Sequence, residues 1–433
     1  MDAGVIFIIL ALALLMFLAF NKLNIVIATI VCSVLIALTN HLSILETIEA
    51  TYMGSYGSFI TSNLLIFAFS ALFGKVMEES GAAKAFAQLI CKVFNDRYAI
   101  YGCILATGLL CYGGVSVFVI VFAVYPIFIE CFRKADIPSR LLPGAIAFAP
   151  FTCFSACFPG APAINNLVPT QYLGTSLMAA PLVGIASGLA MCAFCVFYLE
   201  REMRKAKRNL EHFVPNEKIL AQIQKEEEKG RVITAKDQIL SIIPLVALVL
   251  LINVFAVTAW VAMVIVILFV LIAYWKEISD KMNILGVGLA GGFGAIMNTS
   301  AVVAFGSVVK ATDAFQTIID AITSIGGNPL ISLGLSTTLI AGVTGSGSGG
   351  VGTAMAVLAD KYLAMGVNPE IIHRIVSVAS IGLDSLPHNS AVVTLLAVCG
   401  FTHKEGYKSI FMLTVVNSLL ALAVAILLGS VIY

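Results

Sequence analysis

Apolar runs long enough to cross a membrane recur from one end of the sequence to the other. A spanning helix needs about 20 apolar residues to cross roughly 30 Å of hydrocarbon. The 433-residue chain is 60% hydrophobic and 11% charged, whereas about 25% of the residues in a typical soluble domain are charged. A soluble fold and a disordered chain are therefore excluded, and an all-α polytopic membrane protein is predicted. The expected spans occupy residues 4–20, 24–40, 59–77, 141–172, 178–199, 239–256, 258–274, 285–309, 371–400 and 409–432.

Two further apolar segments, 98–132 and 329–365, are rich in glycine at their middles and are expected to be re-entrant hairpins. Segment 200–238 is polar and is interpreted as a solvated, helical cytoplasmic linker. If the first hairpin returns to the side from which it enters, nearly all of the 25 lysines and arginines lie on the linker side. Positive charge is retained on the cytoplasmic side, so both termini are expected outside. The exceptions are Lys310, Lys361 and Arg374.

The sequence also repeats its local motifs. Two halves, 1–199 and 239–433, are joined by the linker 200–238. By the charge distribution, the first hairpin enters from the cytoplasm and the second from outside. Such inverted-topology repeats are typical of secondary transporters. The repeated features are Pro138 and Pro369 (231 residues apart), Pro159 and Pro387 (228 apart), and Gly74 and Gly306 (232 apart).

Each half contains two segments that are poorly suited to a continuous helix at membrane depth. These are the hairpin tips at 111–116 and 344–350, and the proline-broken helices at 158–162 and 386–389. Irregular backbone is tolerated there only when it is buried in protein or lines a water-filled cavity. New helix N-termini carry partial positive charge and bind anions. The four segments together predict one central site for a small anion.

In this topology no lysine or arginine lies near the membrane middle, so backbone N–H groups and neutral polar side chains are expected to hold a carboxylate. An alternative interpretation is that the small residues serve only to let helices pack closely. The candidate substrate-binding residues are Gly113, Gly114, Ser116, Asn165, Asn166, Thr170, Gly345, Ser346, Gly347, Ser348 and Asn389.

Ionisable residues within the expected spans are few, and such residues are functional candidates by default. Asp384 and His388 are four residues apart beside Pro387, and either one is a candidate for proton coupling. The alternative is a local hydrogen-bonded pair that stiffens the break. The run Asn298-Thr299-Ser300 offers oxygen ligands for sodium, although such clusters also simply line pores.

Three segments resemble the gluconate permease family, the gluconate:proton symporters of the ion-transporter superfamily: 73–83, 113–118 and 383–389. The resemblance extends over nearly the whole chain. It implies a scaffold domain, a transport domain with two hairpins that moves like an elevator, a homodimer, and uptake of gluconate or a related hydroxy acid with protons. The segment 385–389 resembles permeases of hydroxybutyrate more than those of sugar acids.

The predicted function is proton-coupled symport of a small hydroxycarboxylate, of the gluconate or 3-hydroxybutyrate type, by alternating access across the bacterial inner membrane. A sodium-coupled carboxylate transporter is the first alternative. An intramembrane hydrolase built on Ser346 or Ser348 with His388 is a second, although no GxSG or HExxH motif is present. A passive channel is a third. The expected partners are the anion, H⁺ or Na⁺, and the lipid bilayer. No enzymatic activity, cofactor, metal other than sodium or nucleic-acid partner is expected.

Overall fold

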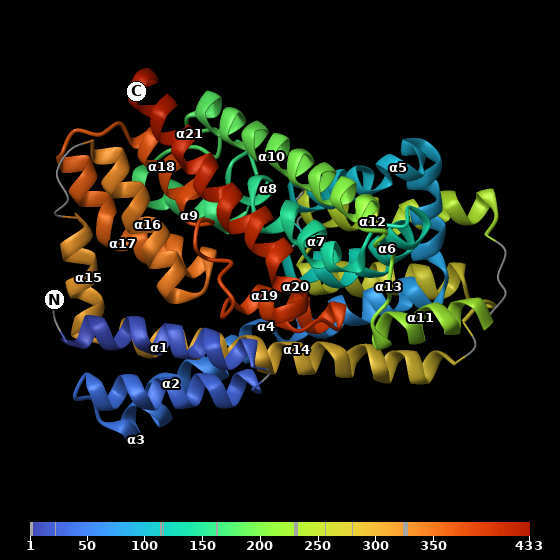
Figure 1. Ribbon diagram of the computed structural model, residues 1–433, viewed down its shortest axis with the longest axis horizontal. Helices are drawn as coiled ribbons and strands as arrows, with labels where there is room; N and C mark the ends of the chain where they lie inside the picture. Colours follow the sequence, from blue (N-terminus) through green and yellow to red (C-terminus); the bar gives the residue numbers. More distant parts are fainter. Residues whose placement is uncertain are drawn as a thin grey trace.

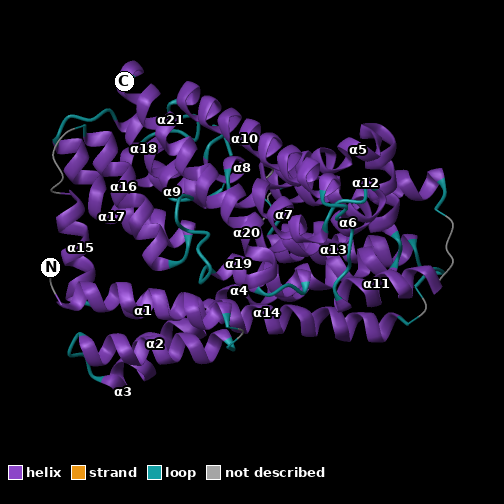
Figure 2. Cartoon of the chain, viewed as in Figure 1, coloured by secondary structure: helices purple, strands orange, loops and turns teal. Residues whose placement is uncertain are grey.

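The computed structural model describes residues 3–21, 23–112, 115, 117–161, 163–228, 233–255, 257–278, 280–323 and 328–433. All regular elements within these ranges are helices (Figure 2). Six helical runs in the described ranges are long and apolar enough to cross a membrane, and shorter apolar helices lie between them. The chain is therefore an all-helical polytopic protein, as the apolar runs predicted. The six runs are Ala3–Phe20, Ile44–Glu79, Pro181–Arg208, Ala235–Ile252, Lys281–Lys310 and His403–Ile432.

The first half contains apolar helices, then a two-helix hairpin, then a broken helix, then one long helix. Gly81 adopts a φ of 73° where the first hairpin begins, a conformation that glycine adopts without strain. The hairpin covers the predicted segment 98–132. The elements are α1 (Ala3–Phe20), α2 (Ile25–Thr39), α3 (Ile44–Glu46), a π-helical turn (Thr47–Tyr52), α4 (Met53–Glu79), α5 (Ala82–Tyr112), α6 (Val117–Lys134), a 3₁₀ turn (Ser139–Leu141), α7 (Leu142–Phe151), α8 (Cys153–Ala156), α9 (Ile164–Leu173) and α10 (Pro181–Arg208).

The second half follows the same order after the linker helix. Its hairpin covers the predicted segment 329–365, and its last long helix pairs with the last helix of the first half. The elements are α11 (Glu217–Glu228), α12 (Ala235–Asn253), α13 (Ala259–Ala273), α14 (Lys281–Lys310), α15 (Asp313–Thr323), α16 (Pro329–Thr344), α17 (Gly347–Ala364), α18 (Pro369–Ala379), α19 (Ser390–Cys399), α20 (His403–Phe411), a π-helical turn (Met412–Val416) and α21 (Asn417–Ile432).

Both helix breaks begin earlier than the sequence suggested. In the first half the helix is interrupted at Thr152, and after the short α8 the described residues 157–161 and 163 are irregular. In the second half the irregular segment runs from residue 380 to 389, not only from 386. Each break begins seven residues before its proline, at Thr152 before Pro159 and at Ser380 before Pro387. Proline disturbs a helix only as far as the carbonyl group four residues earlier, so other contacts determine where each break begins.

The helices form two groups that meet along the length of the molecule (Figure 1). In the α4–α14 group, α4 and α14 lie side by side, α13 packs on α4, and α2 packs on α14. In the hairpin group, which comprises α5–α10 and α16–α21, α10 packs on α21, α9 on α17 and α6 on α19. Each of these contacts joins one half of the chain to the other. Both termini lie at one end of the long axis and α11 lies at the other (Figure 1).

Two glycines that the sequence analysis paired as repeated features, Gly74 and Gly306, lie where these groups are in close contact. A Cβ atom on Gly74 of α4 would lie 2.3 Å from the carbonyl oxygen of Phe122 in α6. A Cβ atom on Gly306 of α14 would lie 2.8 Å from the carbonyl oxygen of Thr344, the last residue of α16. Pro126 has no N–H to donate to Phe122, and Thr344 ends its helix, so both carbonyls face outward from their helices. Glycine is the residue that permits this approach.

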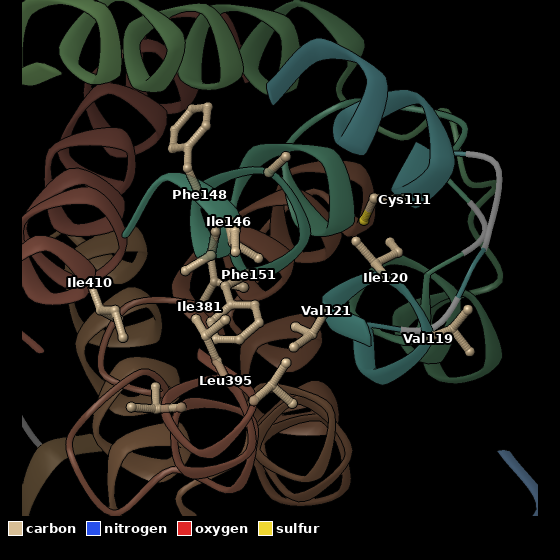
Figure 3. Close-up of a cluster of buried hydrophobic side chains, with 14 of the residues drawn as sticks. Cys111, Val119, Ile120, Val121, Ile146, Phe148, Phe151, Ile381, Leu395 and Ile410 are labelled. Carbon is tan, nitrogen blue, oxygen red and sulfur yellow. The ribbon is translucent and has the colours of Figure 1, made fainter. Parts of the chain in front are cut away.

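Apolar side chains from both halves fill the interior of the hairpin group. In Figure 3, Val121 of α6, Phe151 of α7 and Leu395 of α19 lie around Ile381 of the second break, whereas Phe148 of α7 points away from it. All five side chains are buried. The irregular segment of one half is thus held by the regular helices of the other, because buried apolar contact is what fixes its path.

The sequence predicted a solvated linker, whereas the start of α11 in the linker is hydrogen-bonded to the end of α19. Two backbone carbonyls, those of Cys399 and Gly400, accept hydrogen bonds from the Asn216 amide, both at 2.9 Å. The Lys218 ammonium group donates to the carbonyls of Ala397 and Val398 at 3.1 and 2.6 Å. These carbonyls end α19, so the linker supplies the polar and positive groups that a helix C-terminus favours. The side chains of the charged run 225–229 lie outside the described residues.

The start of the linker is also bound to the loop between α6 and α7. The Asp136 carboxylate accepts from the Phe213 N–H at 2.9 Å and contacts His212 Nδ1 at 2.7 Å. These bonds, first the one from the Phe213 backbone, lower the pKa of Asp136 below its usual value. The Ser139 hydroxyl donates to the carbonyl of Val214. The linker is therefore bound both to the loop between α6 and α7 and to the end of α19.

We expect Asn216→Ala to loosen α11. The change removes two bonds to the end of α19 and one cap bond to the Ile219 N–H, at 2.9 Å. Loss of a capping side chain costs about 1 kcal/mol, so limited trypsin cleavage after the linker lysines should become several-fold faster in the purified protein. Gln224→Ala, at an exposed position of the same helix, is the matched control. Equal cleavage of both variants would contradict the attachment.

Candidate functional site

Four irregular segments, two from each half, border one cavity of about 470 Å³, a volume within the usual range for small-molecule sites. The first hairpin contributes Cys111, Val115 and Val117, and Phe59 of α4 closes one side. Among the described lining residues, Asp384 is the one acidic or basic side chain. The other polar lining side chains are Asn63, Ser155, Asn165, Ser346, Ser348, Asn389 and Ser390.

The tip of the second hairpin is shaped by its small residues. Gly345 ends α16 with a φ of 60°, a left-handed conformation typical of a glycine at a helix C-terminus. Ser346 then caps α17, since its hydroxyl accepts a hydrogen bond from the Gly349 N–H at 3.1 Å. The hydroxyls of Ser346 and Ser348 lie 3.3 Å apart. The tip therefore presents two hydroxyls and the N-terminus of α17 to the cavity.

Asp384 lies at this same helix N-terminus. A Cβ on Gly347 would lie 2.6 Å from Asp384 Oδ2, so the carboxyl group lies against the backbone of the first residue of α17. The Ser385 hydroxyl donates to Oδ1 at 2.9 Å. The sequence predicted that the 345–350 backbone would hold a substrate carboxylate, and in this structure the protein's own carboxyl group occupies part of that position.

His388 and Asn389 hold the second break against the hairpin tip. His388 Nε2 lies 3.0 Å from the carbonyl oxygen of Gly342, and the Asn389 amide donates to the Gly345 carbonyl at 2.9 Å. Asn389 Oδ1 also caps α19 by accepting from the Val392 N–H at 2.9 Å. His388 is buried and does not line the cavity, and its Nδ1 has no partner among the described residues. Asp384 and His388 do not bond to each other among these contacts.

Helix α20 supports the same break from the other side. The Tyr407 hydroxyl donates to the carbonyl of Ser385 at 3.0 Å, and His403 Nε2 lies 2.7 Å from the carbonyl oxygen of Pro387. Irregular backbone buried in a membrane protein needs such partners. Neither Tyr407 nor His403 was singled out in the sequence, because a local pattern does not show which carbonyl a distant side chain reaches.

The candidate substrate-binding residues of the first half do not all line the cavity. Asn165 lines the cavity, and its amide donates to the Ser380 hydroxyl at 2.7 Å. Asn166 lies behind it, with its amide on the carbonyls of Ala161 and Leu177. Thr170 does not line the cavity, and its hydroxyl donates to the Leu167 carbonyl of its own helix at 2.7 Å. Gly113, Gly114 and Ser116 lie outside the described residues.

The three sodium candidates point to different places. The Thr299 hydroxyl donates to the Ala295 carbonyl at 2.9 Å and lies 2.7 Å from the Thr394 hydroxyl. The Ser300 hydroxyl donates to the Ile296 carbonyl at 2.8 Å. Asn298 instead lines a second cavity, of about 610 Å³, between the two helix groups. The three side chains therefore do not converge on one point.

This second cavity lies nearer the linker. Its lining includes Lys75 and Glu78 of α4, Tyr125 of α6 and Lys218 of α11. Lys75 pairs with Glu78 and Glu79 at 3.0 and 3.1 Å. Basic and acidic groups are thus gathered beside the linker, whereas the smaller cavity contains only Asp384 of these types among its described residues.

The chain is similar to a known family of permeases and to a known transporter. The sequence model described as "GntP family permease" matches residues 3–432. A relative from Bacillus subtilis (strain 168), described as "Uncharacterized transporter YxjC", is 32% identical over 461 residues, which cover 97% of each chain. Both matches extend over nearly the whole chain, so they include both hairpins and both breaks.

Proposed function

Since the chain belongs to the GntP family of permeases, and is thus a membrane transporter and not an enzyme, we propose that it carries a small hydroxycarboxylate with a proton. Gluconate and 3-hydroxybutyrate represent the substrate class. The observation that supports this most is the cavity of about 470 Å³ between the hairpin tips and the breaks. It combines helix N-termini, neutral hydrogen-bonding side chains and one titratable carboxyl group.

In this proposal the substrate carboxylate binds the backbone and hydroxyl donors of the second hairpin tip, beside Ser346 and Ser348. The side chains of Asn165 and Asn389 contribute to the hydroxyl or carbonyl end of the substrate, with Asn166 and Thr170 further away. Gly113, Gly114 and Ser116, which lie outside the described residues, are proposed to contribute to the site from the first hairpin. Helix N-termini and amide groups are sufficient to hold an anion without a basic residue in contact.

Asp384 is the proposed coupling group. An ionised Asp384 against the Gly347 backbone competes with a substrate anion for the same place, and two carboxylates that share a site repel each other. A proton from the side of higher acidity neutralises Asp384, and the substrate anion can then bind. On the other side the proton and the anion leave together. His388 links this exchange to hairpin position, since it contacts the Gly342 carbonyl.

The proposed movement is that of an elevator. The halves 1–199 and 239–433 are proposed to be inverted repeats, with both termini outside and the linker 200–238 in the cytoplasm of a bacterial cell. The α4–α14 group would then be the scaffold of a homodimer, and the hairpin group would move along it. The interleaved contacts of α6 with α19 and of α9 with α17 support a hairpin group that moves as one unit.

Uptake by the purified protein in liposomes tests the proposal. Labelled gluconate and 3-hydroxybutyrate are supplied separately, first with an inward proton gradient and then with an inward sodium gradient. A pH difference of two units supports about 100-fold accumulation for one proton per anion. Accumulation with the proton gradient alone is expected. Accumulation that needs sodium would replace the proton mechanism with the sodium alternative, and flux without saturation would indicate a channel.

A further inference from the structure

A completely buried arginine lies directly behind the cavity. Arg374 of α18 has 0% of its surface exposed, and it is the largest fully buried side chain among the described residues. The charge distribution in the sequence predicted that it lies outside with Lys310 and Lys361, and it did not predict that the side chain is buried in the protein. It lies one residue from His373, in a helix that packs on α9. A basic residue in such a place is a functional candidate.

The guanidinium group is held by neutral oxygen atoms only. Nε and Nη2 donate to the Ala179 carbonyl at 3.0 and 2.7 Å, and Nη2 also reaches the Leu177 carbonyl at 3.3 Å. Nη1 donates to the carbonyls of Ala156 and Cys157 at 3.2 and 3.1 Å. The hydrogen-bonding capacity of Arg374 is satisfied by these contacts, but its charge is not neutralised by any of them.

No carboxylate pairs with Arg374 among the side chains that the structure describes. The acidic residue one turn earlier, Glu370, is exposed, and it accepts a hydrogen bond from the Ala180 N–H at 3.3 Å. Tyr433 lies at the end of the chain near both residues. The neutral acceptors satisfy its donors but supply no full negative charge, so the buried guanidinium group makes its surroundings electropositive and favours an anion nearby.

Arg374 is connected to the cavity through Asn166. Arg374 Nη1 donates to Asn166 Oδ1 at 3.1 Å, and His373 Nε2 lies 2.9 Å from the same oxygen. Asn166 adjoins Asn165, which lines the cavity together with Ala163 and Ile164 at the start of α9. Asn166 therefore fixes the first turn of α9, whose positive end faces the cavity.

The same contacts neutralise an opposing charge. Ala156 and Cys157 lie at the C-terminal end of α8, where the carbonyl oxygens carry partial negative charge. Because Arg374 binds both carbonyls, this negative end does not offset the positive end of α9. Ala156 is also the repeat counterpart of Asp384, 228 residues earlier, so the two breaks are associated with charges of opposite sign at matching positions.

We propose that Arg374 is the positioning residue of the anion site and supplies its fixed positive charge without touching the substrate. The inference rests on the proposed function, because it specifies the substrate class of that same site. With Asp384 neutral, the site and its surroundings carry one net positive charge and match a monovalent carboxylate. With Asp384 ionised, the two charges cancel and an anion is no longer favoured.

The test compares each acid with its uncharged amide. Gluconate, gluconamide, 3-hydroxybutyrate and 3-hydroxybutyramide are titrated against the purified protein, and binding is measured by the increase in unfolding temperature. This measurement needs neither transport nor a proton gradient. One charge acting over roughly 10 Å in a protein interior changes anion affinity by about tenfold. We therefore expect Arg374→Gln to weaken binding of the acid about tenfold and to leave binding of the amide unchanged.

Three variants separate charge from packing. Arg374→Lys retains the charge and should restore most of the preference for the acid. Asn166→Asp retains the guanidinium and adds a negative charge next to it, so it should reduce the preference even if Arg374→Gln does not fold. Lys361→Gln removes one positive charge from an exposed position and should change nothing. Equal weakening of acid and amide in both Arg374→Gln and Asn166→Asp would mean that Arg374 is only structural, and the inference would be overturned.

Binding by the wild-type protein shows whether a failure concerns Arg374 alone or the proposed anion site as a whole. If it binds an acid in preference to its amide and Arg374→Gln keeps that preference, the inference about Arg374 fails while the proposed function stands. If the wild-type protein shows no preference for the acid over the amide, the anion site itself fails and this inference fails with it.

Discussion

Replacing Asp384 by asparagine should abolish proton-driven accumulation while preserving exchange of the substrate across the membrane. Asparagine has the size and hydrogen-bonding groups of a neutral carboxylic acid, but it takes up no proton. The side chain that lies against the Gly347 backbone would stay neutral, as in the protonated state. With a pH difference of two units, accumulation should fall from about 100-fold to about onefold. Exchange of labelled for unlabelled substrate at equal pH should continue at a rate within a few-fold of the wild-type rate.

Asp360→Asn is the matched control, because Asp360 lies on the same hairpin helix α17 at an exposed position. It should accumulate substrate as the wild type does. The decisive comparison is between accumulation and exchange in Asp384→Asn. If both are retained, Asp384 has no role in coupling. If both are lost although the protein unfolds at its normal temperature, Asp384 contributes to binding and the coupling group has to be sought at His388.

Much of the helical order could be predicted from the sequence, because membrane spans obey strong local rules. Apolar length indicates a span, and glycine-rich or proline-containing segments indicate a tip or a break. These rules concern neighbouring residues, so they located both hairpins. They were less accurate for the breaks, since the upstream end of a break depends on which distant groups satisfy the backbone. The Tyr407 hydroxyl, for example, reaches the Ser385 carbonyl from 22 residues away.

The candidate site was predictable in outline only. Asn165, Ser346, Gly347, Ser348, Asp384 and Asn389 do line one cavity. The hairpin tip was indicated by its small residues, the amides by their place beside the breaks, and Asp384 by its charge within a span. The acceptors of Arg374 were not predictable, because charge counting assigns a basic residue to a side of the membrane and says nothing of its partners. Its five acceptor residues come from segments about 200 residues away in the chain. Only the packing of α18 on the first break reveals them.

For the linker, too, local sequence patterns indicated the secondary structure but not the contacts. Its composition correctly indicated a polar helical segment, and nothing in its local pattern showed where Asn216 and Lys218 would bind. Their partners are backbone carbonyls at the end of α19, and every helix end has such carbonyls. Side chains that bind backbone leave no complementary residue in the sequence, so contacts of this kind are the ones that a reading of a single sequence misses.

Alanine at Gly74 or Gly306 should slow transport strongly, because both glycines lie where the hairpin group contacts the α4–α14 group. The new Cβ atoms would lie 2.3 Å from the Phe122 oxygen and 2.8 Å from the Thr344 oxygen. Backbone cannot yield as a flexible side chain does, and overpacking of this kind costs about 1–3 kcal/mol. If the hairpin group moves along α4 and α14, the same contact is formed and broken in each cycle. An added barrier of this size lowers the uptake rate about 10- to 100-fold.

Two glycines on the same helices provide controls. A Cβ on Gly57 of α4 or Gly286 of α14 would meet no atom within 4 Å, and alanine favours a helix by about 1 kcal/mol over glycine. Gly57→Ala and Gly286→Ala should therefore transport normally and unfold at the same temperature or higher. If the two halves are inverted repeats, as proposed, Gly74 and Gly306 match each other, and an elevator movement then requires both alanine variants to be slow. A normal rate for one of them, in a protein whose structure is otherwise unchanged, would show that its contact opens or stays fixed throughout the cycle, and the hairpin group could not then slide as one unit.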